Sequence, residues 1–460
     1  MGAPRVCAAL LSLGLSLLSS VPADAVERTA EPNTLVPADA SRYVAGAFPD
    51  RIVATPAQDA ARGFAVAWRS GAGIESPWLE LVVAGDSPDM GVPRRIRAQT
   101  RALAAENGPA RHHRADVDGL QPGTLYAYRV QGDGAWSPWM QLRTAGLPGE
   151  PLELLYFGDT QNKNASLTTR VVREATRHAP RASLVLYAGD LVSGGDGDDD
   201  NEWGEWFDAT DALSGWTLTA PAPGNHEYFE AFEDTPRERR VLGRHWPLQF
   251  ALPGNGIDDG APTTYWFDHQ GVRVAVLDGT SALDLGSAAR QARWLDAVLA
   301  SNPGRWSIVV VHQPFFSPRD GRENSALREH LLPVLRARNV DLVLQGHDHT
   351  YGRRGLDEAS RAPVFVVSVA GAKQYRLSDE ARATMSPVGE DTQWFQVIRI
   401  ADGRLRYEAR TATGRLYDAF DLVDAGPGPK RVEERTEGRI APRDCAREAT
   451  LKGRRDRCWE

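Results

Sequence analysis

The chain has 460 residues, of which 42% are hydrophobic and 25% are charged, and its formal net charge is −8. This length allows two or three domains with a large core. The negative charge argues against a nucleic-acid scaffold, because binding along a phosphate backbone requires clustered Lys and Arg.

The first 25 residues have the features of a secretory signal peptide. Arg5 precedes an apolar run from Val6 to Leu18, and Ala23-Asp24-Ala25 fits the A-x-A cleavage rule. The alternative, an anchoring helix, is disfavoured because the run is shorter than the ~20 residues that cross a bilayer. We therefore predict a secreted or periplasmic protein without a membrane span, in which residues 26–48 form a polar linker.

Residues 49–146 have the pattern of an all-β domain. The runs RIVATP, GFAVAW, WLELVVA and LYAYRV are separated by Gly, Pro and Asp turns. Residues 119–130, GLQPGTLYAYRV, carry the pattern of a tyrosine corner, in which Tyr126 reaches back to a backbone carbonyl. This stretch resembles a fibronectin type III sandwich. We expect the adjacent histidines His112 and His113 to lie on a surface loop.

Residues 150–424 alternate between apolar strands and amphipathic helices, which predicts a layered α/β domain. The predicted strands are LELLYF, SLVLYA, RVAVLD, WSIVVV, VDLVLQ and VFVVSV, and antiparallel strands close the domain after residue 394. The predicted helices are Asn164–His178, Glu202–Leu213, Ser287–Ser301 and Asn324–Arg338. Residues 425–460 form a charged tail.

The tail contains Cys445 and Cys458, which are the only cysteines left after removal of the signal peptide with Cys7. Two cysteines thirteen positions apart in an exported protein predict one disulfide. The alternative is a pair of free thiols in a disordered tail.

Polar residues gather directly after the α/β strands. They are Gly158-Asp159-Thr160-Gln161, Gly189-Asp190, Gly224-Asn225-His226-Glu227, His312 and Gly346-His347-Asp348-His349. Open α/β sheets bind ligands outside the carboxyl ends of their strands, so we expect these side chains to meet there. A Gly-Asp pair alone means little, because Gly85-Asp86 and Gly132-Asp133 read as turns of the β domain.

The residue types indicate a metal centre. Carboxylate oxygens and neutral imidazoles are ligands for Fe, Mn or Zn, and the lack of cysteine argues against a structural zinc site. A bridging carboxylate can hold two cations roughly 3.5–4 Å apart. We expect His347 and His349 to project from one turn, one toward each metal.

The ordered motifs GD, GD, GNHE, VVVH and GHDHTYGR resemble those of the calcineurin-like metallophosphoesterases, and most closely the purple acid phosphatases. The resemblance implies a four-layer α/β/β/α sandwich behind the fibronectin-like domain. It implies that Asp159 and His349 hold one metal and that Asp190 bridges both. Asn225, His312 and His347 would hold the second metal. His226 would donate a proton at the leaving-group or phosphoryl oxygen, while a metal-bound hydroxide attacks phosphorus.

Two positions depart from the family pattern. Purple acid phosphatases have a Tyr three residues after the bridging Asp, where this chain has Ser193. Other phosphoesterases have Asp-x-His in the first motif, where this chain has Gln161, and we predict that the carbonyl oxygen of Gln161 replaces the missing ligand. We therefore predict a colourless enzyme.

The predicted function is hydrolysis of a small phosphate monoester, as in an acid phosphatase. Phosphodiester hydrolysis, of a nucleotide or another diester, needs the same metals and remains an alternative. A non-catalytic surface-binding protein on the same scaffold is the other alternative.

Four smaller features remain open from the sequence. The acidic residues 194–207 are expected in the first turn of a helix, where they complement its dipole. Trp203 and Trp206 reach the rim of the site or pack in the core. Asp348 and Arg353 orient a histidine or contact phosphate. Residues 227–245, with Tyr228, are expected to form a lid or wall.

Overall fold

The computed structural model describes residues 1–2, 33–37, 40–193, 199–257, 262–355, 361–424, 428–446 and 456–459. The predicted signal peptide lies outside the described residues apart from its first two. Among the described helices, none combines the length and the apolar character that a bilayer crossing requires.

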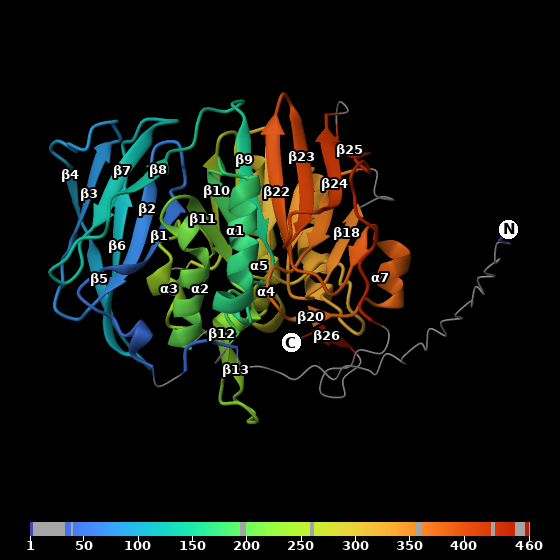
Figure 1. Ribbon diagram of the computed structural model, residues 1–460, viewed down its shortest axis with the longest axis horizontal. Helices are drawn as coiled ribbons and strands as arrows, with labels where there is room; N and C mark the ends of the chain where they lie inside the picture. Colours follow the sequence, from blue (N-terminus) through green and yellow to red (C-terminus); the bar gives the residue numbers. More distant parts are fainter. Residues whose placement is uncertain are drawn as a thin grey trace.

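The N-terminal β domain packs two antiparallel sheets face to face, at the left of Figure 1. In the described part of the chain the sheets have the orders β1-β2-β6-β5 and β4-β3-β7-β8. Their strands are β1 (Asp50–Pro56), β2 (Phe64–Ser70), β3 (Trp78–Val83), β4 (Arg94–Arg97), β5 (Gln99–Ala105), β6 (Gly108–Val117), β7 (Leu125–Val130) and β8 (Met140–Arg143). The predicted all-β sandwich is confirmed.

The expectation of a surface loop at His112 and His113 was wrong. Both residues lie in β6, where their exposed fractions are 4% and 1%. Strand β6 is central, between β2 and β5, so neighbouring strands cover it. The ring of His113 lies between the hydroxyls of Ser70 and Thr100, with N–O distances of 2.8 Å to each.

Tyr126 reaches back along the chain as predicted, but to a different partner. Its hydroxyl accepts a hydrogen bond from the backbone N–H of Gln121 at 2.9 Å, whereas a backbone carbonyl was expected.

The second domain is built around two larger sheets that face each other. Their orders in the described residues are β11-β10-β9-β22-β23-β24-β25 and β14-β15-β16-β17-β19-β18-β21. The first comprises β9 (Leu152–Phe157), β10 (Leu184–Ala188), β11 (Leu218–Ala222), β22 (Trp394–Ala401), β23 (Arg404–Thr411), β24 (Leu416–Val423) and β25 (Arg431–Glu434). The second comprises β14 (Tyr265–His269), β15 (Val272–Val276), β16 (Trp306–Val310), β17 (Leu342–Gln345), β18 (Tyr351–Gly355), β19 (Val364–Val367) and β21 (Val388–Gly389).

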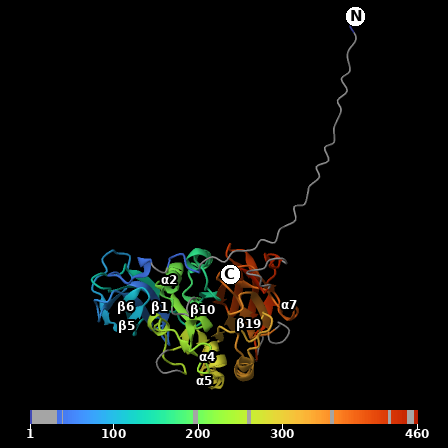
Figure 2. The ribbon, with the colours of Figure 1, turned by 90° about the horizontal axis from the view of Figure 1, so that it is seen from below.

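Helices cover the outer faces of both sheets, which completes the predicted four layers (Figures 1 and 2). On the first sheet lie η2 (Asn164–Thr168), α1 (Thr169–His178) and α2 (Asp200–Ser214). On the second lie α4 (Gly279–Asp284), α5 (Ala288–Ala300), η5 (Leu327–Leu331) and α6 (Leu332–Ala337). Successive residues of β16 point to opposite faces of its sheet. Ile308 and Val310 face the core between the two sheets, whereas Val309 packs in the buried cluster that includes residues of α5.

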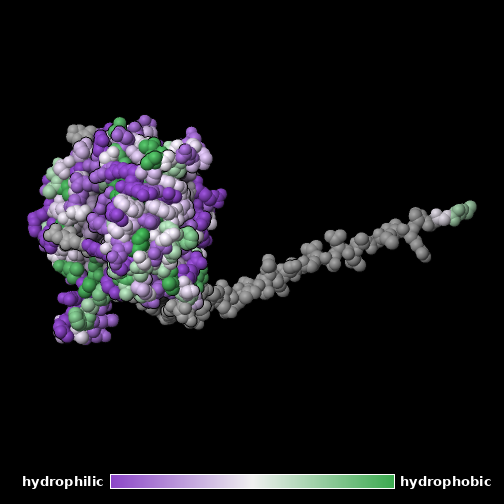
Figure 3. All heavy atoms as spheres, turned by 90° about the vertical axis from the view of Figure 1, so that its left-hand side faces the viewer, coloured by the Kyte–Doolittle hydropathy of each residue, from purple (hydrophilic) through white to green (hydrophobic). Residues whose placement is uncertain are grey.

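The remaining short elements lie around these layers. They are η1 (Ser41–Tyr43), η4 (Asn225–Glu227), α3 (Trp246–Gln249), α7 (Asp379–Thr384), and the strand pairs β12 (Tyr228–Ala231) with β13 (Arg239–Leu242) and β20 (Gln374–Tyr375) with β26 (Arg457–Trp459). The β12–β13 hairpin projects from the body of the molecule (Figures 1 and 3).

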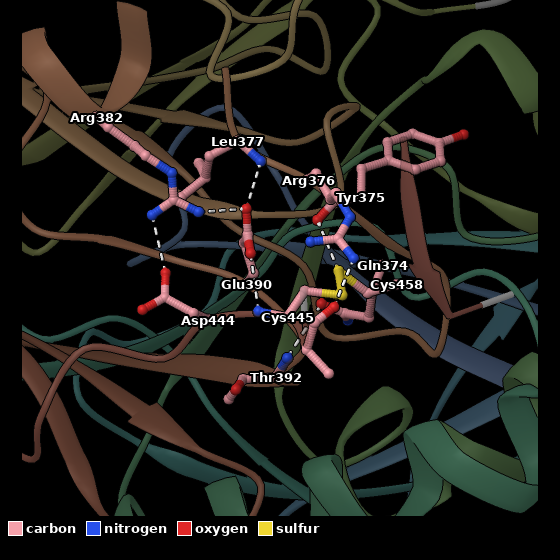
Figure 4. Close-up of a disulfide and its surroundings, with 11 residues drawn as sticks. Gln374, Tyr375, Arg376, Leu377, Arg382, Glu390, Thr392, Asp444, Cys445 and Cys458 are labelled. Atoms are coloured by element: carbon pink, nitrogen blue, oxygen red, sulfur yellow. Dashed lines mark hydrogen bonds and ion pairs between the residues drawn. A yellow bond between two sulfur atoms is a disulfide. The ribbon is translucent and has the colours of Figure 1, made fainter. Parts of the chain in front are cut away.

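The predicted disulfide is present, between Cys445 and Cys458. It holds β26 against β20 (Figure 4). The buried carboxylate of Glu390 supports the bridge, because it accepts the backbone N–H of Cys445 at 2.8 Å and that of Leu377 at 2.7 Å. The tail is therefore tied to the α/β domain at two points, β25 and β26.

The two domains meet at the first turn of α2. Asp200, whose side chain is 2% exposed, lies 2.6 Å from Arg51 and 3.2 Å from Arg69 of the β domain. On its other side Asp200 lies 3.0 Å from His245, which precedes α3. This buried charge cluster fixes the β domain against the α/β domain.

Candidate metal centre

The loops predicted to meet do so at one edge of the α/β domain. Strands β9, β10 and β11 run parallel to one another, as do β16 and β17, so their carboxyl ends lie together. Asp159, Asp190 and Asn225 follow the first three strands, and His312 and the His347–His349 turn follow the other two.

Two glycines allow these loops to approach closely. A Cβ on Gly224 would lie 2.2 Å from Asp190 Oδ1, and a Cβ on Gly346 would lie 2.2 Å from Asp159 Oδ2. Any side chain at these positions would displace a carboxylate of the site. Close contact therefore explains why glycine stands at these two positions.

One group of ligand atoms contains Asp159, Asp190 and His349, with one atom from each within 4.8 Å of the others. His349 Nε2 lies 3.5 Å from Asp159 Oδ1. Gln161 joins this group, because its Nε2 lies 2.9 Å from Asp190 Oδ2 and 3.1 Å from His349 Nε2. The imidazole of His349 is oriented from behind by the carbonyl of Lys373, 3.0 Å from Nδ1.

A second group contains Asp190, His312 and His347, again with one atom from each within 4.8 Å. His312 Nε2 lies 3.1 Å from Asp190 Oδ2, 3.2 Å from Asn225 Oδ1 and 3.0 Å from His347 Nδ1. The other nitrogen of His312, Nδ1, lies 2.8 Å from the carbonyl oxygen of Ala188. Asp190 thus belongs to both groups, whereas His349 belongs to the first group and His347 to the second.

The pKa shifts at the site indicate that a positive charge at its centre would be stabilised. Burial raises the pKa of Asp159 well above its usual value. Burial alone would lower the pKa of His312, but the carboxylates of Asp190 and Asp159 outweigh it and raise that pKa to about 9. The same imidazolium offsets burial at Asp190 and lowers its pKa. A proton on His312 therefore supplies the charge that a metal cation would supply.

The two histidines of the turn have the protonation state that metal binding needs. Burial lowers the pKa of His347 well below its usual value, and Arg322 lowers it further. Burial likewise lowers the pKa of His349, with Lys373 as the next cause. Neutral imidazoles offer lone pairs to a cation without first releasing a proton.

Two buried oxygens without hydrogen-bond partners also fit a cation bound at this site. Asp159 Oδ1 and Gln161 Oε1 are buried, and neither has a hydrogen-bond partner within the described residues. An oxygen buried without a partner costs about 1–3 kcal/mol, which a bound cation would remove. The donor set of carboxylate, amide and imidazole groups suits Mn, Fe or Zn.

Glu227 is a residue of the site for which the sequence analysis predicted no role. Its buried carboxylate accepts the backbone N–H groups of Asp190, Leu191 and Gly224 at 3.0, 2.8 and 2.6 Å. It therefore locks the Asp190 loop to the Asn225 loop. The neighbouring His226 is half-buried, and its backbone N–H donates to Asp190 Oδ1 at 2.9 Å. The position of Glu227 in the motif Gly-Asn-His-Glu is the feature of the sequence that could have indicated its role.

Three residues of the histidine block have structural partners outside the site. Asp348 accepts hydrogen bonds from Arg322 at 2.5 Å and Ser317 at 2.6 Å, which anchors the turn that carries the two histidines. Arg353 is buried against Asp418 at 2.7 Å, and Tyr351 donates to the same carboxylate at 2.7 Å. A phosphate contact is thus not the role of Arg353.

Four other side chains near the site make contacts within the domain. Trp203 and Trp206 are fully buried, and Trp206 Nε1 donates to Thr160 at 3.1 Å beneath the Asp159 loop. Tyr228 is buried and hydrogen-bonds Asp278. Ser193 donates to Glu202 at 2.9 Å. Asp199 caps helix α2, whose first turn is acidic as predicted, while residues 194–198 lie outside the described residues.

Comparison with known families agrees with this layout. Residues 152–351 match the calcineurin-like phosphoesterase family, and residues 49–144 match the purple acid phosphatase N-terminal domain. The first match contains every side chain of the two ligand groups.

Individual relatives are distant. An uncharacterized protein of Mycobacterium tuberculosis is 27% identical over 349 residues, which cover 67% of this chain and 64% of that protein. Purple acid phosphatase 1 of Ipomoea batatas is 25% identical over 60% of this chain and 58% of its own length. This chain thus spans less than two thirds of either relative. The structure of purple acid phosphatase PPD1 from yellow lupin (Lupinus luteus) has the same fold, with a TM-score of 0.67 at 17% identity over 88% of this chain and 77% of that chain.

Proposed function

Since the chain carries a calcineurin-like phosphoesterase domain behind a purple acid phosphatase N-terminal domain, we propose that it hydrolyses phosphate monoesters at a dinuclear metal centre. The observation that carries the proposal is the position of Asp190, which belongs to both groups of ligand atoms. One carboxylate shared by two such groups is the arrangement that a metal pair requires.

We assign the ligands by these contacts. Asp159, His349 and Gln161 would hold the first cation, and Asn225, His312 and His347 the second, with Asp190 between them. Two bound cations would lower the pKa of a water molecule and polarise the phosphoryl group.

The chain's own groups prepare this chemistry. Glu227 fixes the backbone on which Asp190 and Asn225 stand. The carbonyls of Ala188 and Lys373 hold the rings of His312 and His349 in place. His226, next to Asn225 and only half-buried, is positioned to donate a proton to the leaving oxygen of an ester.

Ser193 supports the proposal that the enzyme is colourless. Its hydroxyl is engaged by Glu202, and it carries no phenolate that could form a coloured complex with ferric iron. A strong visible charge-transfer band in the pure protein would contradict this part.

The domain and export assignments also remain proposals. We propose domain limits of 49–146 and 150–424, because each pair of facing sheets is formed within one of these ranges, apart from β25 of the tail. We propose export by a cleaved signal peptide of residues 1–25, which the disulfide supports because such bonds persist in oxidising compartments.

The decisive experiment assays the purified mature protein with p-nitrophenyl phosphate and bis-p-nitrophenyl phosphate between pH 4 and 9. Each assay is run with Mn, Zn or Fe and beside a chelated control. We expect metal-dependent turnover with the monoester faster than the diester. A faster diester reaction would replace the monoester proposal, and two bound metals without turnover of either ester would contradict hydrolysis of simple phosphate esters.

Asp190→Asn tests the site within the same assay. We expect kcat to fall by about three orders of magnitude or more, since the variant weakens both metal positions at once. Asp211→Asn is the matched control, because Asp211 is exposed on α2 and pairs with the exposed Arg173. Retention of most activity in Asp190→Asn, with the fold intact by circular dichroism, would contradict the bridge.

A further inference from the structure

A cavity of about 480 Å³ lies outside the metal centre, on the side of α1. Its walls come from η2 and α1, the segment before β22, the turn between β23 and β24, and the tail that follows β25. No side chain of the two ligand groups lines it. The volume is in the range of small-molecule sites.

The cavity and the metal centre share one wall, the segment 371–374. Gly371 donates to the carbonyl oxygen of Asp159 at 2.6 Å, and the carbonyl of Lys373 orients His349. Ala372 and Gln374 of the same segment line the cavity. Strand β22 runs antiparallel to β9, so its start lies at the sheet edge where the Asp159 loop begins.

Three arginines line the cavity without a carboxylate partner among the described residues. Arg170 donates to the amide oxygen of Gln393 at 2.7 and 3.1 Å, and Arg443 donates to the hydroxyl of Thr392 at 3.0 Å. The guanidinium of Arg415 has no hydrogen-bond or ion-pair partner in the described part of the chain. Gln393 and Thr392 are neutral, so they orient two of these charges without neutralising them.

On the neighbouring surface of the sheet, by contrast, arginines are paired with a carboxylate. Arg404, Arg406 and Arg435 all pair with the single carboxylate of Asp421, at 2.6 to 2.8 Å. Among the described residues that line the cavity, Asp391 is the one acid, against three arginines. In a chain of net charge −8 this is a local excess of positive charge.

We propose that this cavity is a second ligand site, which binds a small organic anion with a phosphate-like or carboxylate group and an apolar body. Arginine presents the donors that pair with such groups in a bidentate manner. The apolar part of the wall is formed by Leu167, Ala372, Ala412 and Ile440. The ligand is either the distal part of the substrate or a separate effector.

Phenylphosphonate is a suitable probe, because it combines a phosphate-like anion with an apolar ring and its P–C bond cannot be hydrolysed as an ester. Calorimetric titration of the metal-loaded protein and of chelated protein separates the two sites. We expect one site to survive chelation. In the chelated protein, the double variant Arg415→Gln/Arg443→Gln should bind about tenfold more weakly or worse, since two charge-assisted contacts are lost.

Two controls make the result specific. Arg101→Gln removes another exposed arginine, from β5 of the β domain, and should leave binding unchanged. The double Lys variant at positions 415 and 443 keeps the charge and should retain binding better than the Gln variant. Loss of all binding on chelation, unchanged binding in the Gln variant, or equal weakening in Arg101→Gln would overturn the proposal.

Steady-state kinetics then show whether the bound anion is the distal part of a substrate or a separate effector. If the cavity holds the distal part of a substrate, the Gln variant raises KM for phosphotyrosine, which carries a carboxylate, and leaves KM for p-nitrophenyl phosphate unchanged. If it holds a separate effector, neither KM changes while the binding difference persists. Both results support the site, and the binding experiment does not depend on the proposed hydrolysis.

Discussion

Gln161 is the residue of the first motif that we predicted to replace a missing ligand. Its side-chain amide lies between Asp190 and His349, in the position from which a ligand would face the first cation. Rotation of the amide by half a turn exchanges its nitrogen for the buried, unpartnered oxygen. We therefore propose that Gln161 is a neutral ligand whose amide oxygen can turn toward a cation.

Substitution of Gln161 tests this assignment. We expect Gln161→Ala to weaken binding of one of the two metals by about 10–100-fold, the range seen when a supporting group of a metal site is lost. Gln161→Glu keeps an oxygen donor and should restore the affinity. Metal content and affinity, measured by competition with a chromophoric chelator, decide the matter. Equal affinities in all three proteins would show that Gln161 is not a ligand.

His113 illustrates a residue whose environment is set by distant parts of the chain. It lies between Ser70 on β2 and Thr100 on β5, and burial lowers its pKa to about 4. In the unfolded chain a histidine titrates near 6.5. Between these two values the unfolded state binds the proton and the folded state does not.

The stability of the protein should therefore fall as the pH is lowered from about 6.5 to about 4. His113 alone contributes a slope of at most about 1.4 kcal/mol per pH unit in this window. We expect His113→Asn to reduce that slope, whatever its effect at neutral pH. The measurement is urea unfolding at a series of pH values. His330→Asn is the control, since the side chain of His330 is 38% exposed; an equal change of slope in both variants would contradict the interpretation.

The gathering of the candidate metal ligands was predictable because their signals are local. Asp159, Asp190 and His347 each follow a glycine at the end of an apolar strand, in a fixed order along the chain. Burial and pairing of other residues depend on segments far away. Arg353 lies beside the histidines in sequence, yet its partner is Asp418, 65 positions away. No local pattern indicates such a pairing.

At the scale of elements, the tail shows how a short segment becomes structured. Strand β26 has three residues and pairs with the two-residue strand β20, which is too little backbone pairing to be stable alone. The Cys445–Cys458 bridge and the contact of Arg319 with Asp456 at 2.8 Å hold it in place. The disulfide therefore substitutes for an extended ladder.

Loss of the disulfide should destabilise the protein. For a loop of this size the chain-entropy argument gives about 3 kcal/mol. We expect the double variant Cys445→Ser/Cys458→Ser to unfold at a lower urea concentration than the wild type. Dithiothreitol should lower the wild-type midpoint to the same value and leave the variant unchanged. A wild-type midpoint that does not respond to the reductant, despite two titratable thiols, would contradict this role.

Long helices were predicted from the sequence, whereas short strands were missed. The predicted helix at 164–178 is present as η2 and α1, and the one at 202–213 as α2, because ten or more residues give a clear period. The β12–β13 hairpin and β25 were not predicted. Their strands have four residues each, so the alternation is too short to recognise.

At the scale of the molecule, one buried acid connects the two domains. Asp200 accepts hydrogen bonds from Arg51 and from Asn107 of the β domain, and it contacts His245 of the α/β domain. Burial alone would raise the pKa of Asp200, but the bond from His245 and the charges of Arg51 and Arg69 hold it far below its usual range. The β domain is therefore fixed in orientation, and its contact with the α/β domain depends on this charge.

Replacement of Asp200 by Asn keeps the shape and leaves the buried guanidinium of Arg51 without its charge partner. Breaking one side of a buried ion pair typically costs about 3–5 kcal/mol. We expect Asp200→Asn to lower the stability by an amount of this order and to separate the unfolding of the β domain from that of the α/β domain in calorimetry. The control is Asp208→Asn on the same helix, whose partner Arg42 is 61% exposed and which should cost about 1 kcal/mol or less. If both variants unfold in one transition at the same temperature, the charge of Asp200 is not what holds the two domains together.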